Sequence, residues 1–125
     1  MTCVTAMTDA DRQKLAVEFC GLSLATPLVL LSGCVGFGEE YTRVAGFSNH
    51  DAGAVCLKGT TLMPRLGNRP HRIAETSAGM LNAIGLQNPG TDYVVNTILP
   101  SLDFTETRFI ANVSGSTVEE YAEVT

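Results

Sequence analysis

The fold of this chain is decided by the stretch Ala54-Val55-Cys56-Leu57-Lys58-Gly59, in which four apolar residues end at a lysine and a glycine. An apolar run this short is typical of a strand that is buried on both faces, as strands are in parallel sheets. Two further runs have the same character, residues 27–31 (PLVLL) and residues 109–113 (FIANV). Because segments with helical features separate the three runs, the sequence predicts strands that alternate with helices in a parallel α/β sheet.

Three segments carry helical signals. Glu39-Glu40-Tyr41 follows several glycines and places carboxylates where the positive end of a helix dipole would stabilise them. Apolar residues recur at helical spacing over residues 94–102, after Asn88-Pro89 as a start. Ser116-Thr117-Val118-Glu119 fits the capping-box pattern S-x-x-E, so a helix is expected to begin there.

The N-terminal region precedes the first parallel strand. Residues 1–14 are polar and mixed, and we expect them to form a loose extension. Apolar and polar residues alternate over residues 15–19, and Cys20-Gly21 then leads into residues 22–25, which predicts a short β-hairpin. We therefore divide the chain into an extension, residues 1–14, and one partial domain, residues 15–125.

Three parallel strands are too few to close a barrel, and an open sheet of three strands leaves two exposed edges. The sequence also stops soon after a predicted helix start. We therefore expect the chain to be the N-terminal part of a larger α/β protein.

Composition excludes several classes of protein. The chain has 125 residues, of which 45% are hydrophobic and 17% charged, which excludes a disordered chain. Its net charge of −5 argues against general binding to nucleic acid or to anionic membranes. Four cysteines without a C-x-x-C pair, and two histidines, predict no metal site. No apolar stretch approaches the ~20 residues of a membrane helix, and five charged residues between Asp9 and Glu18 exclude the apolar core of a signal peptide, so we expect a cytoplasmic protein.

A polar residue lies at the end of each predicted strand: Ser32, Lys58 and Asn112. Ligands of parallel α/β folds bind at the carboxyl ends of the strands, so these residues predict a polar ligand site. Lys58 is one of only two lysines. A lysine at this position either pairs with an anion, which offsets its desolvation, or extends to solvent, and both interpretations stay open.

The segment between the second strand and Pro89 is unusually long for a loop in a compact domain, and such loops are usually functional. Amides at Asn82, Gln87 and Asn88 flank Gly85, a combination that suits the edge of a heterocycle but also occurs in ordinary turns. The loop is also basic, and for most of its basic residues we favour a solvated loop over an interface. These residues are Arg65, Arg69, His71 and Arg72.

The glycines of residues 32–38 run as G-x-x-G-x-G, which is not the dinucleotide order G-x-G-x-x-G. The pattern indicates either a simple tight turn or, as we favour, a turn whose backbone lies close to a flat or anionic ligand.

A series of motifs recurs along the chain: residues 32–41 (SGCVGFGEEY), 57–61 (LKGTT), 68–70 (NRP), 75–76 (ET), 78–90 (AGMLNAIGLQNPG) and 110–115 (IANVSG). Taken together, these motifs resemble the class 1 dihydroorotate dehydrogenases, and most closely the type B catalytic subunit, which works with an electron-transfer partner. The resemblance runs from about Leu15 to Thr125.

The resemblance implies a (β/α)₈ TIM barrel that binds FMN, of which this chain would supply roughly the first three strands. It implies oxidation of dihydroorotate to orotate in pyrimidine biosynthesis, with hydride transfer to FMN. The residues implied to contact FMN are Ser32, Lys58, Gly59 and Asn112. Those implied to hold dihydroorotate or orotate are Lys58, Asn82, Ala83, Ile84, Gly85 and Leu86. The base, a cysteine in this class, would lie beyond Thr125, so no catalytic residue is assigned here and the isolated chain is expected to be inactive.

The implied partners are an iron–sulfur FAD electron-transfer subunit and further copies of the chain, in a homodimer or heterotetramer. Two alternatives remain open on the sequence. One is a related flavin-dependent barrel that reduces pyrimidine bases. The other is a half-barrel that binds flavin or pyrimidine without catalysis.

Overall fold

The computed structural model describes residues 8–125, so residues 1–7 of the predicted extension lie outside the described residues. The chain divides into two compact units. The first contains the chain up to Leu57 together with Leu102–Ile110, and the second contains Lys58–Ser101 and Ala111–Thr125. The predicted sheet belongs to the first unit, and most of the predicted site residues belong to the second.

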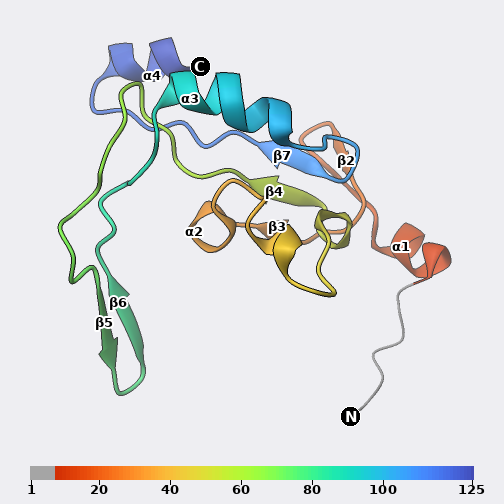
Figure 1. The fold of residues 1–125 in the computed structure, drawn as a ribbon. Coiled ribbons are helices and arrows are strands. Elements are labelled where there is room, and N and C mark those ends of the chain that lie inside the picture. The colour runs from red at the N-terminus through yellow and green to blue at the C-terminus, as the bar shows by residue number, and fades with distance from the viewer. Residues whose placement is uncertain (1–7) are drawn as a thin grey trace. The chain divides into compact units, whose positions relative to one another are not determined.

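The first unit contains a parallel sheet of three strands, β3 (Val29–Leu30), β4 (Ala54–Cys56) and β7 (Arg108–Ile110), in the order β3-β4-β7 (Figure 1). Each strand overlaps one of the three apolar runs in the sequence, and the strands pair in parallel, so the prediction of a parallel sheet is confirmed. Ala54 and Val55 on the central strand have no exposed surface. Burial of a side chain such as that of Val55 contributes about 2 kcal/mol to folding.

The N-terminal part of the first unit consists of a helix and a hairpin. Helix α1 (Asp9–Leu15) begins at Thr8, whose side chain accepts a hydrogen bond from the Asp11 backbone N–H. The described part of the predicted loose extension is therefore helical. Strands β1 (Val17–Phe19) and β2 (Leu22–Leu24) pair in antiparallel register. Cys20 and Gly21 join them with φ values of 50° and 78°, as a two-residue hairpin turn requires.

The segment after β3 differs from the prediction. No long helix opens at Glu39–Tyr41; instead helix α2 spans Ser32–Val35 and only a 3-10 turn covers Tyr41–Arg43. Gly36, with φ of 56°, ends α2. The Glu40 carboxylate accepts hydrogen bonds from the Phe37 backbone N–H at 3.1 and 3.3 Å, so this side chain closes a local turn rather than supporting the first turn of a helix. A second 3-10 turn, Asn49–Asp51, leads towards β4.

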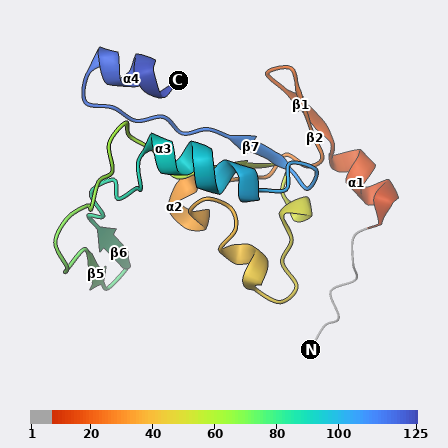
Figure 2. The same cartoon turned by 45° about the horizontal axis from the view of Figure 1, so that its top comes forward.

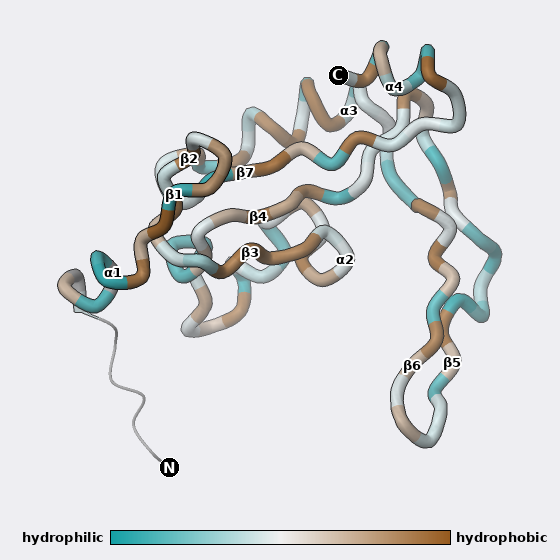
Figure 3. Tube along the Cα trace, turned by 180° about the vertical axis from the view of Figure 1, so that it is seen from behind, coloured by the Kyte–Doolittle hydropathy of each residue, from teal (hydrophilic) through white to brown (hydrophobic). Residues whose placement is uncertain are grey.

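Gly38 shows why this turn needs glycines. Its φ is 88°, and a Cβ there would stand 3.1 Å from both the Phe109 ring and the Val55 side chain. The buried Asn49 amide donates to the Gly38 carbonyl at 3.0 Å, which ties this turn to the 3-10 turn Asn49–Asp51 of the same unit. Figure 3 shows the apolar colouring of β3 in this region.

The second unit begins with the long segment that was predicted as a loop. It contains an antiparallel hairpin, β5 (Ile73–Thr76) and β6 (Gly79–Asn82), with a two-residue turn. The hairpin extends away from the helices of the same unit (Figures 1 and 2). All eight of its strand residues are exposed. No alternation of buried and polar residues therefore marks these strands in the sequence.

The helices of the second unit follow the prediction closely. Helix α3 (Thr91–Tyr93) continues as a π-helical turn, Val94–Ile98, and then as a 3-10 turn, Leu99–Ser101. Helix α4 (Val118–Val124) begins at Thr117, whose side chain accepts from the Glu120 backbone N–H at 3.2 Å. The cap therefore lies one residue beyond the predicted Ser116. Within residues 8–125, no helix has both the length and the apolar character needed to span a bilayer.

Candidate functional site

Three segments of the second unit meet at Gly59. This glycine is buried, and a Cβ built on it would stand 3.0 Å from Leu86 Cδ1, 3.2 Å from Ser114 Oγ and 3.6 Å from Asn112 Nδ2. Three of the residues predicted to form a ligand site, Gly59, Leu86 and Asn112, are thus brought together from distant parts of the sequence. Because there is little room for a side chain at position 59, the backbone there is the surface that its neighbours contact.

Backbone hydrogen bonds keep these segments in register. The Thr60 N–H donates to the Asn112 carbonyl at 2.9 Å, and the Ser114 N–H donates to the Thr60 carbonyl at 2.8 Å. Thr60 and Val113 form a parallel bridge. The Asn112 amide is therefore held on a paired backbone rather than on a free loop.

Lys58 precedes this meeting point and follows the β4 strand. Its side chain is half-buried, and its carbonyl accepts a hydrogen bond from the Thr60 hydroxyl at 3.0 Å. Among the residues that the structure describes, the only salt bridge of a lysine is that between Lys14 and Asp11. A half-buried lysine with no carboxylate partner among the described residues is suited to pair with an anionic ligand.

The predicted substrate segment, residues 82–86, is shaped by Asn68. The Asn68 N–H donates to the Ile84 carbonyl at 2.9 Å, and its amide donates to the Ala83 carbonyl at 2.8 Å. Gly85 has φ of 78°, and a Cβ there would stand 2.7 Å from the Asn68 backbone nitrogen. A side chain at position 85 would therefore push Asn68 away and change the path of the segment.

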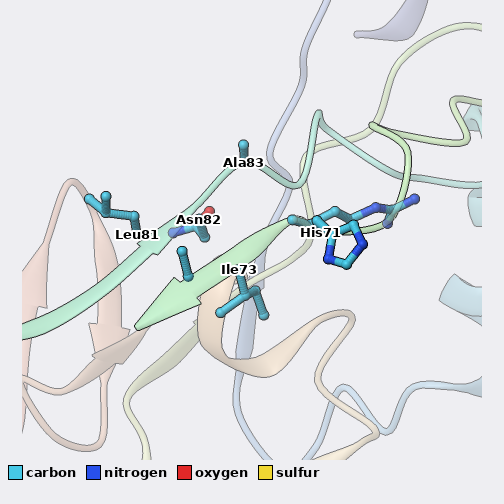
Figure 4. Close-up of a pocket in the computed structure, with 7 residues that line it drawn as sticks. His71, Ile73, Leu81, Asn82 and Ala83 are labelled. Carbon is cyan, nitrogen blue, oxygen red and sulfur yellow. The ribbon is translucent and has the colours of Figure 1, made fainter. Parts of the chain in front are cut away.

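Asn82 and Ala83 lie elsewhere, in a small pocket at the base of the hairpin (Figure 4). The pocket has a volume of about 160 Å³ and is also lined by His71, Arg72, Ile73, Ala74 and Leu81. Pockets for cofactors and drug-sized ligands usually measure about 300–1,000 Å³, so this pocket alone is too small to enclose a flavin. The contacts at Gly59 come from Leu86 and Asn112, and the structure does not bring Asn82 or Ala83 into that cluster.

Two of the four basic residues of the long segment, Arg65 and Arg72, are half-buried and make hydrogen bonds within the chain, whereas Arg69 and His71 are exposed, as a solvated loop requires. The Arg72 guanidinium donates to the Asn68 carbonyl, to the Gln87 side chain and to the Leu66 carbonyl. The Arg65 guanidinium donates to the Ser116 hydroxyl. Nothing in the sequence distinguishes these arginines from exposed ones, because two of their four partners are backbone carbonyls and the other two are side chains distant in the sequence.

Ser32 belongs to the first unit, as the first residue of α2, where it is half-buried. The Cys34 and Val35 N–H groups both donate to the Leu31 carbonyl, at 2.9 and 3.3 Å, and close the turn around it. Contact of Ser32 with a flavin stays a prediction.

The resolved shifts in pKa lie outside the candidate site. Hydrogen bonds from Thr105 lower the pKa of Asp103, and those from Thr8 and Lys14 lower the pKa of Asp11. The pKa of Glu119 is lowered by a hydrogen bond from its own backbone N–H and by one with the Thr117 side chain. Within the described part of the chain, no group of histidine, cysteine and carboxylate residues could hold a metal ion.

Comparison with known proteins assigns almost the whole chain to one family. Residues 14–125 match the family model described as dihydroorotate dehydrogenase. Relatives named dihydroorotate dehydrogenase B (NAD(+)), catalytic subunit, from Bacillus caldolyticus and Anoxybacillus flavithermus are 55% and 56% identical over 111 residues. Each match covers 89% of this chain and 35% of the relative, so the chain spans about one third of the length of these curated relatives.

A solved structure shares the fold. The ligand-free dihydroorotate dehydrogenase of Eimeria tenella superposes with a TM-score of 0.65 at 22% sequence identity. The superposition covers 89% of this chain and 34% of that structure.

Proposed function

Because the chain belongs to the dihydroorotate dehydrogenase family, we propose that the protein containing it oxidises dihydroorotate to orotate in pyrimidine biosynthesis, with FMN as cofactor. The observation that carries the proposal is the meeting of Leu86 and Asn112 at Gly59, next to the half-buried Lys58. The proposal includes the (β/α)₈ barrel, in which β3, β4 and β7 would be the first three strands. Their consecutive parallel order supports this.

The residues at the meeting point fit a flavin. The pyrimidine edge of a flavin ring presents one N–H donor and carbonyl acceptors, and the Asn112 amide can both donate and accept. The buried glycine at position 59 allows close approach of the backbone. The Lys58 ammonium would favour negative charge on the ring. When bound, FMN would supply the acceptor for the hydride of dihydroorotate; Ser32 is proposed as a further contact.

Lys58 and residues 82–86 are proposed to bind and orient the substrate. Dihydroorotate carries a carboxylate and several amide groups, so an ammonium and an adjacent amide-rich segment are complementary to it. Asn82 would donate to and accept from the substrate ring, while Ala83, Ile84, Gly85 and Leu86 would form a wall of backbone and apolar surface. No residue of this chain is proposed as the base that removes the proton from C5. That group is assigned to a cysteine outside the chain.

The proposed partners follow from the names of the relatives. Those names describe a catalytic subunit of an NAD(+) type enzyme, which supports a second, electron-transfer subunit. We assign to that subunit an iron–sulfur centre and FAD, and to the assembly a homodimer or heterotetramer in the cytoplasm.

The test is to express the open reading frame in which this segment lies and to measure oxidation of dihydroorotate with an artificial electron acceptor. We expect turnover, and we expect the mass of the released flavin to be that of FMN. The 125-residue chain alone should give no turnover. Reduction of pyrimidine bases without oxidation of dihydroorotate would support a reductase instead. Binding of orotate without turnover of any pyrimidine would support a non-catalytic binder.

A further inference from the structure

Asn88 is a buried amide whose hydrogen bonds are all made within the second unit. Its side chain Oδ1 accepts from the Thr61 N–H at 3.1 Å and from the Gly90 N–H at 3.0 Å. Its Nδ2 donates to the Thr61 hydroxyl at 3.0 Å and to the Leu86 carbonyl at 2.9 Å. Asn88 is 4% exposed and Thr61 is 2% exposed, so water does not compete for these groups.

The Thr61 hydroxyl fixes the orientation of the amide. Its single hydrogen has two acceptors within reach, the Met63 carbonyl at 2.7 Å and Asn88 Oδ1 at 3.3 Å, and the shorter contact to Met63 leaves the hydroxyl oxygen as an acceptor towards Asn88. The amide nitrogen of Asn88 must therefore face Thr61 Oγ1 and the Leu86 carbonyl. The oxygen then faces the two backbone N–H groups, and all four hydrogen-bonding positions of the amide are used.

The amide acts on a residue with an unusual backbone. Leu86 has φ of 53°, a left-handed conformation that leucine rarely adopts. The hydrogen bond from Asn88 to the Leu86 carbonyl holds this conformation, and the Leu86 side chain is the group that comes within 3.0 Å of a Cβ built on Gly59. Through Thr61, the same amide is tied to the segment that carries Lys58 and Gly59.

From these contacts we propose that Asn88 and Thr61 form a clasp that positions Leu86 against Gly59 and thereby sets the affinity for the pyrimidine substrate. The proposal rests on the proposed function, since it concerns the same site. Asn88 is a positioning residue: it acts through Leu86 rather than by touching the ligand. Because Leu86 is assigned to the substrate and not to the flavin, disturbing the clasp is expected to weaken substrate binding while FMN is retained.

The test uses the flavin-loaded protein made from the full open reading frame. Asn88→Asp keeps the shape of the side chain but replaces the amide donor by a carboxylate oxygen, which faces the Leu86 carbonyl and the Thr61 hydroxyl without a hydrogen to donate. We expect the KM for dihydroorotate and the Kd for orotate to rise at least tenfold, with the FMN content unchanged. Asn96→Asp is the matched control. Asn96 is exposed and its amide donates only to the Asp92 carbonyl among the described residues, so KM should stay within twofold.

KM is the deciding quantity because partial unfolding lowers the number of active sites, and hence the apparent kcat, without changing KM. The second variant is Thr61→Val, which removes the hydroxyl but keeps the shape of the side chain. It should also raise the KM for dihydroorotate. An unchanged KM in the flavin-loaded variants would overturn the proposal, as would loss of FMN from both variants, since the pair would then serve folding alone. If the unsubstituted protein fails to oxidise dihydroorotate, the proposed function fails first and the clasp with it.

Discussion

Replacement of Lys58 by alanine is the perturbation that most sharply separates a binding lysine from a solvated one. Lys58 is half-buried, and no carboxylate among the described residues forms a salt bridge with it. At an effective dielectric constant of about 20, a unit charge about 4 Å away interacts with it by about 4 kcal/mol. Desolvation of the ligand offsets part of this, and loss of one preorganised polar group typically costs about 2.7–4 kcal/mol in the transition state.

We therefore expect Lys58→Ala to lower kcat/KM for dihydroorotate by roughly 10²–10³-fold, which corresponds to that range of free energy. Steady-state oxidation by the full protein, with an artificial acceptor, measures the change. The control is Lys14→Ala, which removes the only other lysine. Its side chain is 75% exposed and pairs at 3.2 Å with Asp11, and an exposed pair of this kind contributes little to stability. A Lys58→Ala protein with kcat/KM within twofold of the control would show that this lysine is a solvated residue at the strand end.

Two further predictions concern packing and titration. Gly59→Ala should raise the KM for dihydroorotate by roughly three- to tenfold, because the new methyl displaces Leu86 and Ser114 and such overpacking costs about 1 kcal/mol. Gly79→Ala is the control and should leave KM unchanged, because a Cβ there meets no atom within 4 Å. Equal effects of the two substitutions on KM would contradict this reasoning. Thr105→Ala should raise the pKa of Asp103 part of the way towards its ordinary value of 3.8, because the hydroxyl hydrogen bond, the largest cause of the lowered pKa, is lost while the backbone N–H bond remains. The lowered pKa stabilises the folded state above pH 3.8, and this stabilisation is lost as the pH falls through the lowered pKa. An NMR titration of the Asp103 carboxyl that is identical in the two proteins would refute the prediction.

The strands could be predicted because they depend on local composition. Ala54–Cys56 is an apolar run with no polar interruption, which is typical of a strand in a buried parallel sheet. The helix after β3 could not be placed in the same way. The carboxylate of Glu40, which suggested a helix start, instead accepts from Phe37, and this depends on the positive φ values of Gly36 and Gly38.

The site was predictable as a set of residues but not as an arrangement. Lys58 and Asn112 follow apolar runs, and that pattern is visible in the sequence. The contact of Gly59 with Leu86 depends on the path of the long segment between them. That path is set by Asn68, Arg72 and Asn88 through hydrogen bonds to backbone carbonyls, and backbone carbonyls carry no sequence signal. The exposed hairpin was missed for the related reason that no burial pattern marks it.

The most direct measurement is a crystal structure of the full protein with FMN and orotate bound. We expect Lys58 Nζ to lie within hydrogen-bond distance, about 3 Å, of both the flavin ring and the orotate carboxylate, with the Asn112 amide on the flavin and Leu86 against the orotate. A structure in which the Lys58 ammonium faces solvent, or in which FMN binds away from Gly59 and Asn112, would contradict the site proposed for this chain.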